Sequence, residues 1–228
     1  MNDLHFFDRS REFDIIERRL PHWTQAGVMC FVTFRTNDSM PAGVLNQWRA
    51  ERQDWLRRQG INPMAGDWRD QLQRLDKLLQ EEFFRSFSEK WHNHLDAGHG
   101  DCVLRRGALS RIVADSLLHA NGEKYLLTDF VIMPNHVHLL AAFPGERALL
   151  DQCRSWKHFT ATEINREVGR RGRFWQQDGF DHLVRSESQY RHFQRYIAHN
   201  PVKAGLSPGE FVHWQDESHR PKYPSRSA

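Results

Sequence analysis

The feature that most constrains the fold is a mostly apolar stretch over residues 125–143 that contains one turn signal, Pro134-Asn135. The segment before that pair, 125–133, is rich in the β-branched and aromatic residues typical of strands, and the segment after it, 136–143, is mostly apolar. A proline-asparagine pair between two such segments is typical of a tight turn. The stretch therefore predicts an antiparallel hairpin.

The returning strand of this hairpin begins with His136-Val137-His138. Side chains alternate along a strand, so the two histidines share one face while Val137 and Leu139 point into the core. Two imidazoles on one face of a strand can hold one divalent metal ion. Taken alone, such a pair is more often two satisfied structural histidines, so a metal site needs further ligands.

The remaining segments predict an α+β fold with an antiparallel sheet and helices on one face. Apolar residues at helical spacing indicate helices, and short β-rich runs indicate strands. We expect strands at 28–34 and 180–185, helices within 44–95 and at about 107–120 and 149–168, and a last helix that Ser186 caps and Pro201 ends.

Domain organisation follows from this order. Residues 1–206 are predicted to form a single domain, with a helical insertion at about 36–100 that Gly60, Pro63 and Gly66 divide. Residues 207–228 are rich in proline and serine, and we expect a poorly packed C-terminal tail.

Composition excludes some classes of protein. The chain has 228 residues, of which 27% are charged and 39% hydrophobic, as in a globular protein. It has no apolar stretch of the roughly 18–20 residues that a membrane span needs. The N-terminus lacks a basic segment followed by an apolar core, which argues against a secretory signal. Its three cysteines are few and far apart, so we expect reduced thiols and a cytoplasmic location.

Charge is unevenly distributed along the chain. The formal net charge is +3, but the segment from Arg154 to Lys203 alone has ten basic side chains against five acidic ones. A local basic field suits a polyanionic partner such as nucleic acid. An ordinary solvated face explains the same charges equally well.

The last predicted helix supplies candidates to complete the site. Tyr196 and Asn200 are four residues apart, so they share a helical face. The Asn200 amide oxygen is a suitable ligand for Mg²⁺ or Mn²⁺, and the Tyr196 phenol is a potential covalent nucleophile. A metal ion held by His136, His138 and Asn200 could polarise a phosphodiester while Tyr196 attacks it.

Simpler interpretations of these residues stay open. Tyr196 could be a packing residue, and an asparagine before proline is common where a helix ends. Tyr190 is six residues earlier, about 120° around the helix from Tyr196, which favours packing or substrate contact. Zinc is disfavoured because no third histidine, cysteine or carboxylate stands at a motif position.

The chain resembles the single-tyrosine HUH transposases, in the IS200-like superfamily, and within them the REP-associated tyrosine transposase family. HUH means histidine, a bulky apolar residue and histidine, here His136-Val137-His138. The resemblance covers about 22–35 and 100–206. Its phrases are Phe31-Val32-Thr33-Phe34-Arg35, Met133-Pro134-Asn135-His136-Val137-His138, Ser155-Trp156-Lys157-His158-Phe159-Thr160, Phe174-Trp175-Gln176 and the run from Tyr196 to Leu206.

This resemblance implies a ferredoxin-like (RRM-like) fold and Mg²⁺- or Mn²⁺-dependent cleavage of single-stranded, hairpin-bearing DNA. It implies that Tyr196 takes the 5′-phosphate into a phosphotyrosine bond and leaves a 3′-hydroxyl, and that rejoining reverses the step. Asn200 stands where mobile-element relatives commonly have glutamine, which shortens the reach of the amide by one methylene.

Several other residues are candidates for DNA contact. Indole rings can stack on unpaired bases, worth roughly 1–3 kcal/mol each, although core packing is the stronger alternative for tryptophan. Basic side chains can contact phosphates. The candidates are Trp156, Lys157, Arg170, Arg171, Arg173, Trp175, His192 and Lys203.

Two other functions remain as alternatives. The first is a non-catalytic DNA- or RNA-binding protein on the same fold, and the second is a metal phosphodiesterase that uses water. The sequence leaves open whether the protein is a monomer or a homodimer.

Overall fold

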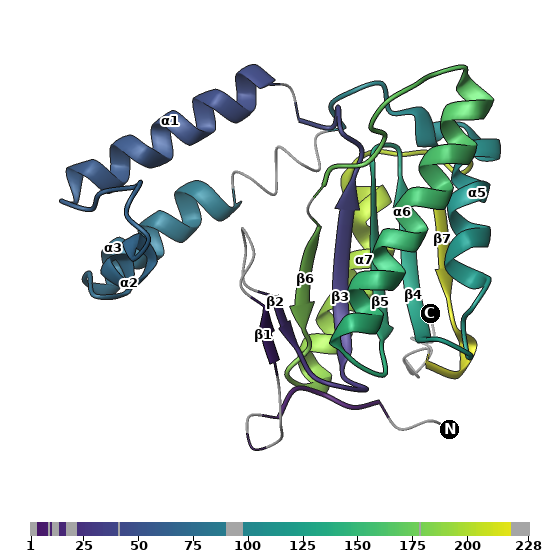
Figure 1. The fold of residues 1–228 in the computed structure, drawn as a ribbon, viewed down its shortest axis with the longest axis horizontal. Helices are drawn as coiled ribbons and strands as arrows, with labels where there is room; N and C mark the ends of the chain where they lie inside the picture. Colours follow the sequence, from purple (N-terminus) through teal and green to yellow (C-terminus); the bar gives the residue numbers. More distant parts are fainter. Residues whose placement is uncertain are drawn as a thin grey trace, which may run out of the picture. The chain divides into compact units, whose positions relative to one another are not determined.

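The computed structural model describes residues 4–8, 10, 14–16, 22–40, 42–89, 98–177 and 179–219. The chain divides into two compact units (Figure 1). The first comprises residues 1–37 and 102–228, and the second comprises residues 38–101. The second unit has nearly the bounds predicted for the helical insertion.

The first unit is built on a five-stranded antiparallel sheet with the strand order β6-β3-β5-β4-β7 (Figure 1). Along the chain, β3, α5, β4, β5, α6 and β6 give the β-α-β-β-α-β order of a ferredoxin-like fold. The bounds are β3 (Met29–Arg35), β4 (Leu126–Met133), β5 (His136–Ala142), β6 (Phe180–Leu183) and β7 (Val212–Gln215). The predicted α+β class, antiparallel sheet and β4–β5 hairpin are confirmed.

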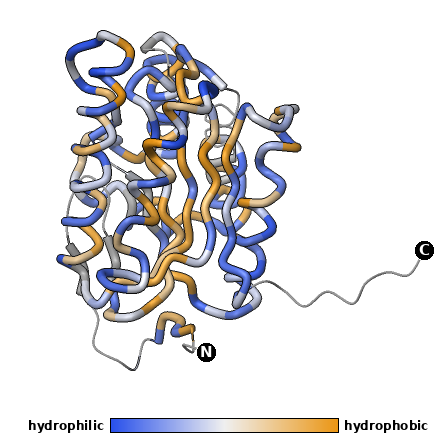
Figure 2. The backbone as a smooth tube through the Cα atoms, turned by 90° about the vertical axis from the view of Figure 1, so that its right-hand side faces the viewer, coloured by the Kyte–Doolittle hydropathy of each residue, from blue (hydrophilic) through white to orange (hydrophobic). Residues whose placement is uncertain are grey.

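One face of the sheet packs against helices α5 (Gly107–Leu118) and α6 (Glu146–Val168). Val137 and Leu139 of β5 point to this side, as their alternation with the histidines predicts. Helix α6 ends at Gly169, whose φ of 67° suits a residue without a side chain. Figure 2 shows the strands as the most hydrophobic part of this unit.

The opposite face of the sheet packs against helix α7 (Glu187–Lys203). The expectation that the helices share one face is therefore wrong for α7. Every residue of β3 and of β5 is buried, so both faces of the sheet need a cover. The main chain N–H of Gln189 donates to the Ser186 hydroxyl, which confirms the predicted cap.

Helix α7 continues through Pro201 and ends at Lys203, which corrects the predicted end. Proline removes only one main-chain donor from the helix. The last turn is kept by a hydrogen bond from the Ala204 N–H to the Asn200 carbonyl (3.0 Å).

The predicted tail from residue 207 onwards is also corrected. Strand β7 pairs with β4 at the edge of the sheet. The Trp214 ring stacks on Phe130, with 5.5 Å between the ring centroids. This long-range pairing has no local signal in a segment rich in proline and serine. Residues 220–228 of the predicted tail lie outside the described residues.

Two smaller parts complete the description. A separate antiparallel pair is formed by β1 (Asp14–Ile16) and β2 (His22–Thr24). The second unit contains α1 (Ala42–Arg58), α2 (Trp68–Gln73), α3 (Lys77–Phe83) and a π-helical turn (Phe84–Glu89). Its core is formed by Trp55, Leu56, Ile61, Leu72, Phe83 and Phe87.

None of the described helices is both long and apolar enough to cross a membrane. Cys30, Cys102 and Cys153 are not in disulfides.

Candidate active site

The two histidines of β5 are buried on the α7 face of the sheet. His136 and His138 are 1% and 2% exposed, and their ring centroids are 4.6 Å apart. They lie opposite Arg35 and Thr33 of β3 in the strand register. The shared face predicted from their spacing is what the structure has.

Each imidazole is oriented by a neighbour through Nδ1. His136 Nδ1 lies 2.7 Å from Asn135 Oδ1, and His138 Nδ1 lies 2.7 Å from the Thr33 hydroxyl. A carbonyl oxygen only accepts, so Nδ1 of His136 donates and its lone pair is on the buried Nε2. The same tautomer results in His138 when Nδ1 donates to Thr33. Such partners orient metal-binding histidines in proteins.

The electrostatic environment keeps His136 neutral. Burial lowers its pKa well below the usual 6.5, and the positive charge of Arg35 and the neighbouring His138 act in the same direction. A neutral imidazole is the form that binds a metal ion. The sequence-based prediction of a metal site is thus compatible with the protonation state of this histidine.

Tyr196 of α7 packs against His138. The two ring centroids are 5.2 Å apart with the planes at 72°, and the Tyr196 ring also meets the edge of Phe31 at 5.9 Å. Tyr196 is partly exposed, unlike the fully buried Tyr190. The histidine face and the predicted nucleophile therefore come together within one chain.

Tyr190 has a different environment. Its hydroxyl donates to the Asp129 carboxylate (3.3 Å), and burial and that carboxylate raise its pKa far above the usual 10. A phenol this buried and this hard to ionise is a poor nucleophile. The interpretation of Tyr190 as a packing residue agrees with this placement.

Asp129 also fixes the rotation of α7 on the sheet. It accepts hydrogen bonds from Gln194 Nε2 (3.1 Å) and from Gln215 Nε2 (2.6 Å), in addition to Tyr190. This carboxylate, at a bulge of β4, therefore joins α7, β4 and β7. With Tyr190 and Gln194 held toward Asp129, Tyr196 lies against His138.

Asn200 is the least satisfied polar residue of the site. It is 2% exposed, and neither its Oδ1 nor its Nδ2 has a hydrogen-bond partner among the described residues. It lies one turn beyond Tyr196, toward the sheet end where β5 begins. A buried amide without a partner costs about 1–3 kcal/mol, so it needs an explanation such as a bound ion.

The predicted donor set differs from that of a usual zinc site, and binding of Mg²⁺ or Mn²⁺ stays a prediction. Within the described part of the chain, no three His, Cys, Asp or Glu side chains form a metal-binding group. Two neutral imidazoles and one neutral amide oxygen are a weaker donor set than a usual zinc site. His136, His138 and Asn200 remain predicted ligands.

Sequence reasoning missed three residues around the histidines: Thr33, Arg35 and Asn135. Thr33 and Arg35 reach the site through the pairing of β3 with β5, a contact over about a hundred residues. Arg35 is only 6% exposed and lies opposite His136, so it brings a buried positive charge to the site. Asn135 was assigned only to the turn, although it directly precedes His136.

Both tryptophans predicted as DNA contacts are buried, which argues against contact by Trp156, whereas contact by Trp175 stays a prediction. Trp156 is 1% exposed and packs edge-on against Tyr125 at 5.0 Å. Trp175 is 3% exposed, packs edge-on against Phe34 and donates from Nε1 to the Thr160 hydroxyl (2.8 Å). Both fill the α5/α6 side of the sheet, where Trp175, unlike Trp156, also lines a cavity.

The polar candidates for DNA contact are more accessible. His192 and Lys203 on α7 are exposed, as are Arg170, Arg171 and Arg173 in the loop after α6. This loop joins the end of β3 through bonds from Asn37 N–H to the Phe174 carbonyl and from Gln176 N–H to the Arg35 carbonyl. The loop thus lies at the sheet end that carries His136. DNA contact by these residues and by Lys157 stays a prediction.

The fold and the site define a ferredoxin-like α+β domain with paired histidines facing a tyrosine helix. Residues 113–200 match the family described as "Transposase IS200 like". That segment contains both histidines, Tyr196 and Asn200, and the match confirms the predicted resemblance to this family. The match supports a transposase-like role in DNA processing.

One solved structure is also similar, the "REP associates tyrosine transposase bound to a REP hairpin". The identity is 16%, the TM-score is 0.42, and the similarity covers 82% of this chain and 73% of that one. No curated protein matches the chain.

Proposed function

We propose that this protein is a metal-dependent endonuclease and strand transferase for single-stranded, hairpin-bearing DNA, with Tyr196 as its nucleophile. One observation carries the proposal: within one chain, the Tyr196 ring packs against His138, beside His136. The IS200-like family match over the same residues supports it.

The proposed reaction exchanges one phosphodiester for another. The Tyr196 oxygen, having lost its proton to solvent, attacks the scissile phosphorus, and the bond to the 3′-oxygen breaks. The leaving 3′-oxygen takes up a proton, and the 5′-phosphate stays on Tyr196. Attack by a 3′-hydroxyl reverses these steps and releases the tyrosine, so that joining needs no external energy source.

His136, His138 and Asn200 would hold Mg²⁺ or Mn²⁺, which when bound polarises the scissile phosphate. Arg35 supplies a second positive charge opposite His136. We propose that its guanidinium binds a non-bridging phosphate oxygen and stabilises the charge that develops there during attack. Asp129 holds the rotation of α7 that presents Tyr196.

We also propose that a single chain provides the complete site, whether the protein is a monomer or a homodimer. The Asp129 bonds to Tyr190 and Gln194 hold α7 on the sheet of its own chain. Mixing a Tyr196→Phe chain with a His138→Ala chain should therefore restore no activity. Restored activity would indicate that the tyrosine helix acts on the partner subunit.

The test is covalent capture of DNA. A pool of 3′-labelled single-stranded oligonucleotides, each with a fixed hairpin and randomised flanks, is incubated with the protein and Mg²⁺ or Mn²⁺. We expect a labelled protein band on a denaturing gel, absent with Tyr196→Phe and present with the control Tyr190→Phe.

Other results would favour the alternatives. Cleavage that survives Tyr196→Phe without an adduct would contradict the proposal and indicate attack by water. Tight binding without any cleavage would indicate a non-catalytic nucleic-acid-binding protein.

A further inference from the structure

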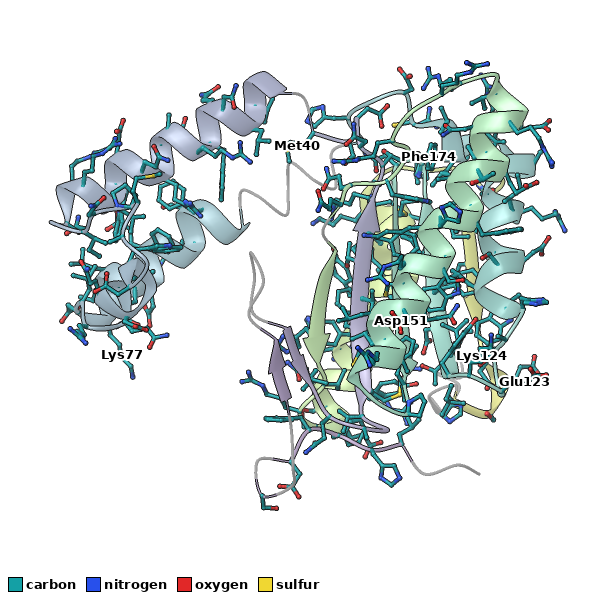
Figure 3. The ribbon with its side chains drawn as sticks, viewed as in Figure 1. Met40, Lys77, Glu123, Lys124, Asp151 and Phe174 are labelled. Atoms are coloured by element: carbon teal, nitrogen blue, oxygen red, sulfur yellow. The ribbon has the colours of Figure 1, made fainter. Side chains whose placement is uncertain are left out.

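A cavity of about 460 Å³ lies on the sheet face opposite the histidines, between α6, the end of β3, residues 172–177 and Gly179. Val32, Thr33 and Phe34 of β3 line it, although the Thr33 hydroxyl contacts His138 and Arg35 lies opposite His136 in the candidate active site. Figure 3 labels Phe174 on the loop that borders the cavity and Asp151 on α6. The size is within the range of pockets that bind small molecules.

The inner walls of this cavity are apolar and partly aromatic. Phe34 and Phe174 both pack edge-on against Trp175, with ring centroids 4.8 and 4.7 Å from it. The hydrogen bond from Trp175 Nε1 to Thr160 fixes this group. The other apolar lining residues are Val32, Leu149, Leu150, Cys153 and Ala161.

The rim of the cavity is basic. Arg154, Lys157 and His158 lie on neighbouring turns of α6, and Arg173 lies on the loop. Of the described residues that line the cavity, none is acidic. Arg154 also contacts Asp151 at 3.3 Å, but this pair is exposed and therefore weak.

The loop that closes the cavity is held in place. Lys157 Nζ donates to the carbonyls of Gln176 and Gln177, at 3.2 Å each. Gly179 passes so close to β3 that a Cβ there would lie 3.0 Å from the Thr33 carbonyl oxygen. The cavity is therefore bounded by fixed main chain on the loop side.

We propose that this cavity binds one unstacked nucleotide of the single-stranded DNA, with the base between the apolar walls and its phosphate at the basic rim. Aromatic walls beside cationic side chains are how proteins bind unpaired bases. The inference rests on the proposed function for its substrate class. It also explains why two of the sequence motifs that carry the family resemblance, 155–160 and 174–176, both contribute residues to this cavity and not to the histidine site.

The first test measures binding of a fluorescent single-stranded oligonucleotide by anisotropy, in the full chain carrying Tyr196→Phe to prevent covalent capture. Filling the cavity with Ala161→Trp, or removing the rim charge with Arg173→Gln, should weaken binding roughly 5- to 150-fold. The matched control Arg147→Gln changes an exposed arginine of α6 outside the cavity and should leave binding within about twofold.

A second readout does not depend on the folding of these variants. Cys153 lines the cavity, and in a Cys102→Ser chain its modification by a thiol reagent should be slowed by the oligonucleotide. A free deoxynucleoside monophosphate should give no comparable protection. Equal protection by the free nucleotide would indicate that the cavity binds a small molecule and not single-stranded DNA, and would overturn the proposal.

The outcomes separate this inference from the proposed function. Unchanged binding by Ala161→Trp and Arg173→Gln, with no protection of Cys153, would overturn the proposal that the cavity binds a nucleotide. An adduct at Tyr196 in the same protein would still support the proposed reaction. Weakened binding and protection without any adduct would support the cavity and overturn the proposed reaction.

Discussion

The two faces of the five-stranded sheet are both buried, but they are built from different side chains. The face toward α5 and α6 is an apolar core that includes Val137 and Leu139 of β5. The face toward α7 mixes apolar residues with His136, His138, Arg35 and Asn200, all at most 6% exposed. Burying polar groups costs free energy, so the second face is not what a chain selected only for stability would have.

Along strand β5, core packing and the candidate active site are assigned to alternate residues. In β5, alternate residues serve the core and the site, so a change at one position affects one face. Substitutions on the α5/α6 face should lower stability without a specific effect on chemistry. Substitutions on the α7 face should change chemistry and, at one position, raise stability.

The largest expected effect is on the stability of the apolar face. Trp156→Ala should lower the free energy of unfolding by about 3–5 kcal/mol, because Trp156 is 1% exposed and packs against Tyr125 and Phe143. Urea denaturation measures it. Phe159→Ala on the same helix, at a residue 51% exposed, is the control and should change stability by less than about 0.5 kcal/mol. Equal effects would contradict the core assignment.

The next effect is on the chemistry of the polar face. Arg35→Met should slow adduct formation by about 100- to 1,000-fold, the usual cost of removing one donor to a developing oxyanion. Single-turnover rates measure it, with Arg35→Lys expected to retain part of the activity. A phosphorothioate at the scissile position should slow the native chain in a stereospecific way, and this preference should vanish in Arg35→Met. A preference that persists would show that Arg35 only supports the fold.

Sequence patterns were sufficient for the local parts of this structure. The β4–β5 hairpin, the capped helix α7 and the shared face of the histidines follow from spacings of a few residues. Thr33, Arg35 and strand β7 could not be found in this way, because they reach their places through pairing with strands far along the chain.

Exposure was the other quantity that the sequence did not determine. Trp156 and Lys157 are neighbours in one helical turn, yet the indole is in the core and the ammonium is at the rim of a cavity. Helical periodicity allows either arrangement when tryptophan and lysine are both amphipathic. The burial of the Asn200 amide likewise has no sequence signal beyond its spacing from Tyr196.

A substitution at Asn200 should have a smaller effect, and it should stabilise the protein. Asn200→Leu should raise the free energy of unfolding by about 1–2 kcal/mol in EDTA, because it removes a buried amide that has no hydrogen-bond partner in the described part of the chain. The same change should abolish adduct formation. Gln194→Leu is the matched control, since Gln194 is buried on the same helix but donates to Asp129 and should lose stability. A loss of stability in Asn200→Leu would indicate that the amide is bonded in the folded protein.

The smallest effect is a pH dependence of stability at His136. Its folded-state pKa lies below the ordinary 6.5, so the ring is neutral in both states at higher pH and contributes no slope there. As the pH falls below about 6.5, the unfolded chain takes up a proton that the folded chain does not. The folded state should then lose at most about 1.4 kcal/mol per pH unit.

His136→Gln in EDTA should remove this part of the slope between pH 7 and 5, as measured by urea denaturation. His192→Gln, at an exposed histidine of α7, should keep it. Equal slopes for the native chain and His136→Gln would mean that the imidazole titrates normally in the folded protein. The expected result would show that burial keeps His136 in the neutral form that a metal ligand needs, and that this lowers the stability of the folded state at low pH. The apolar residues of the opposite face have no such pH-dependent cost.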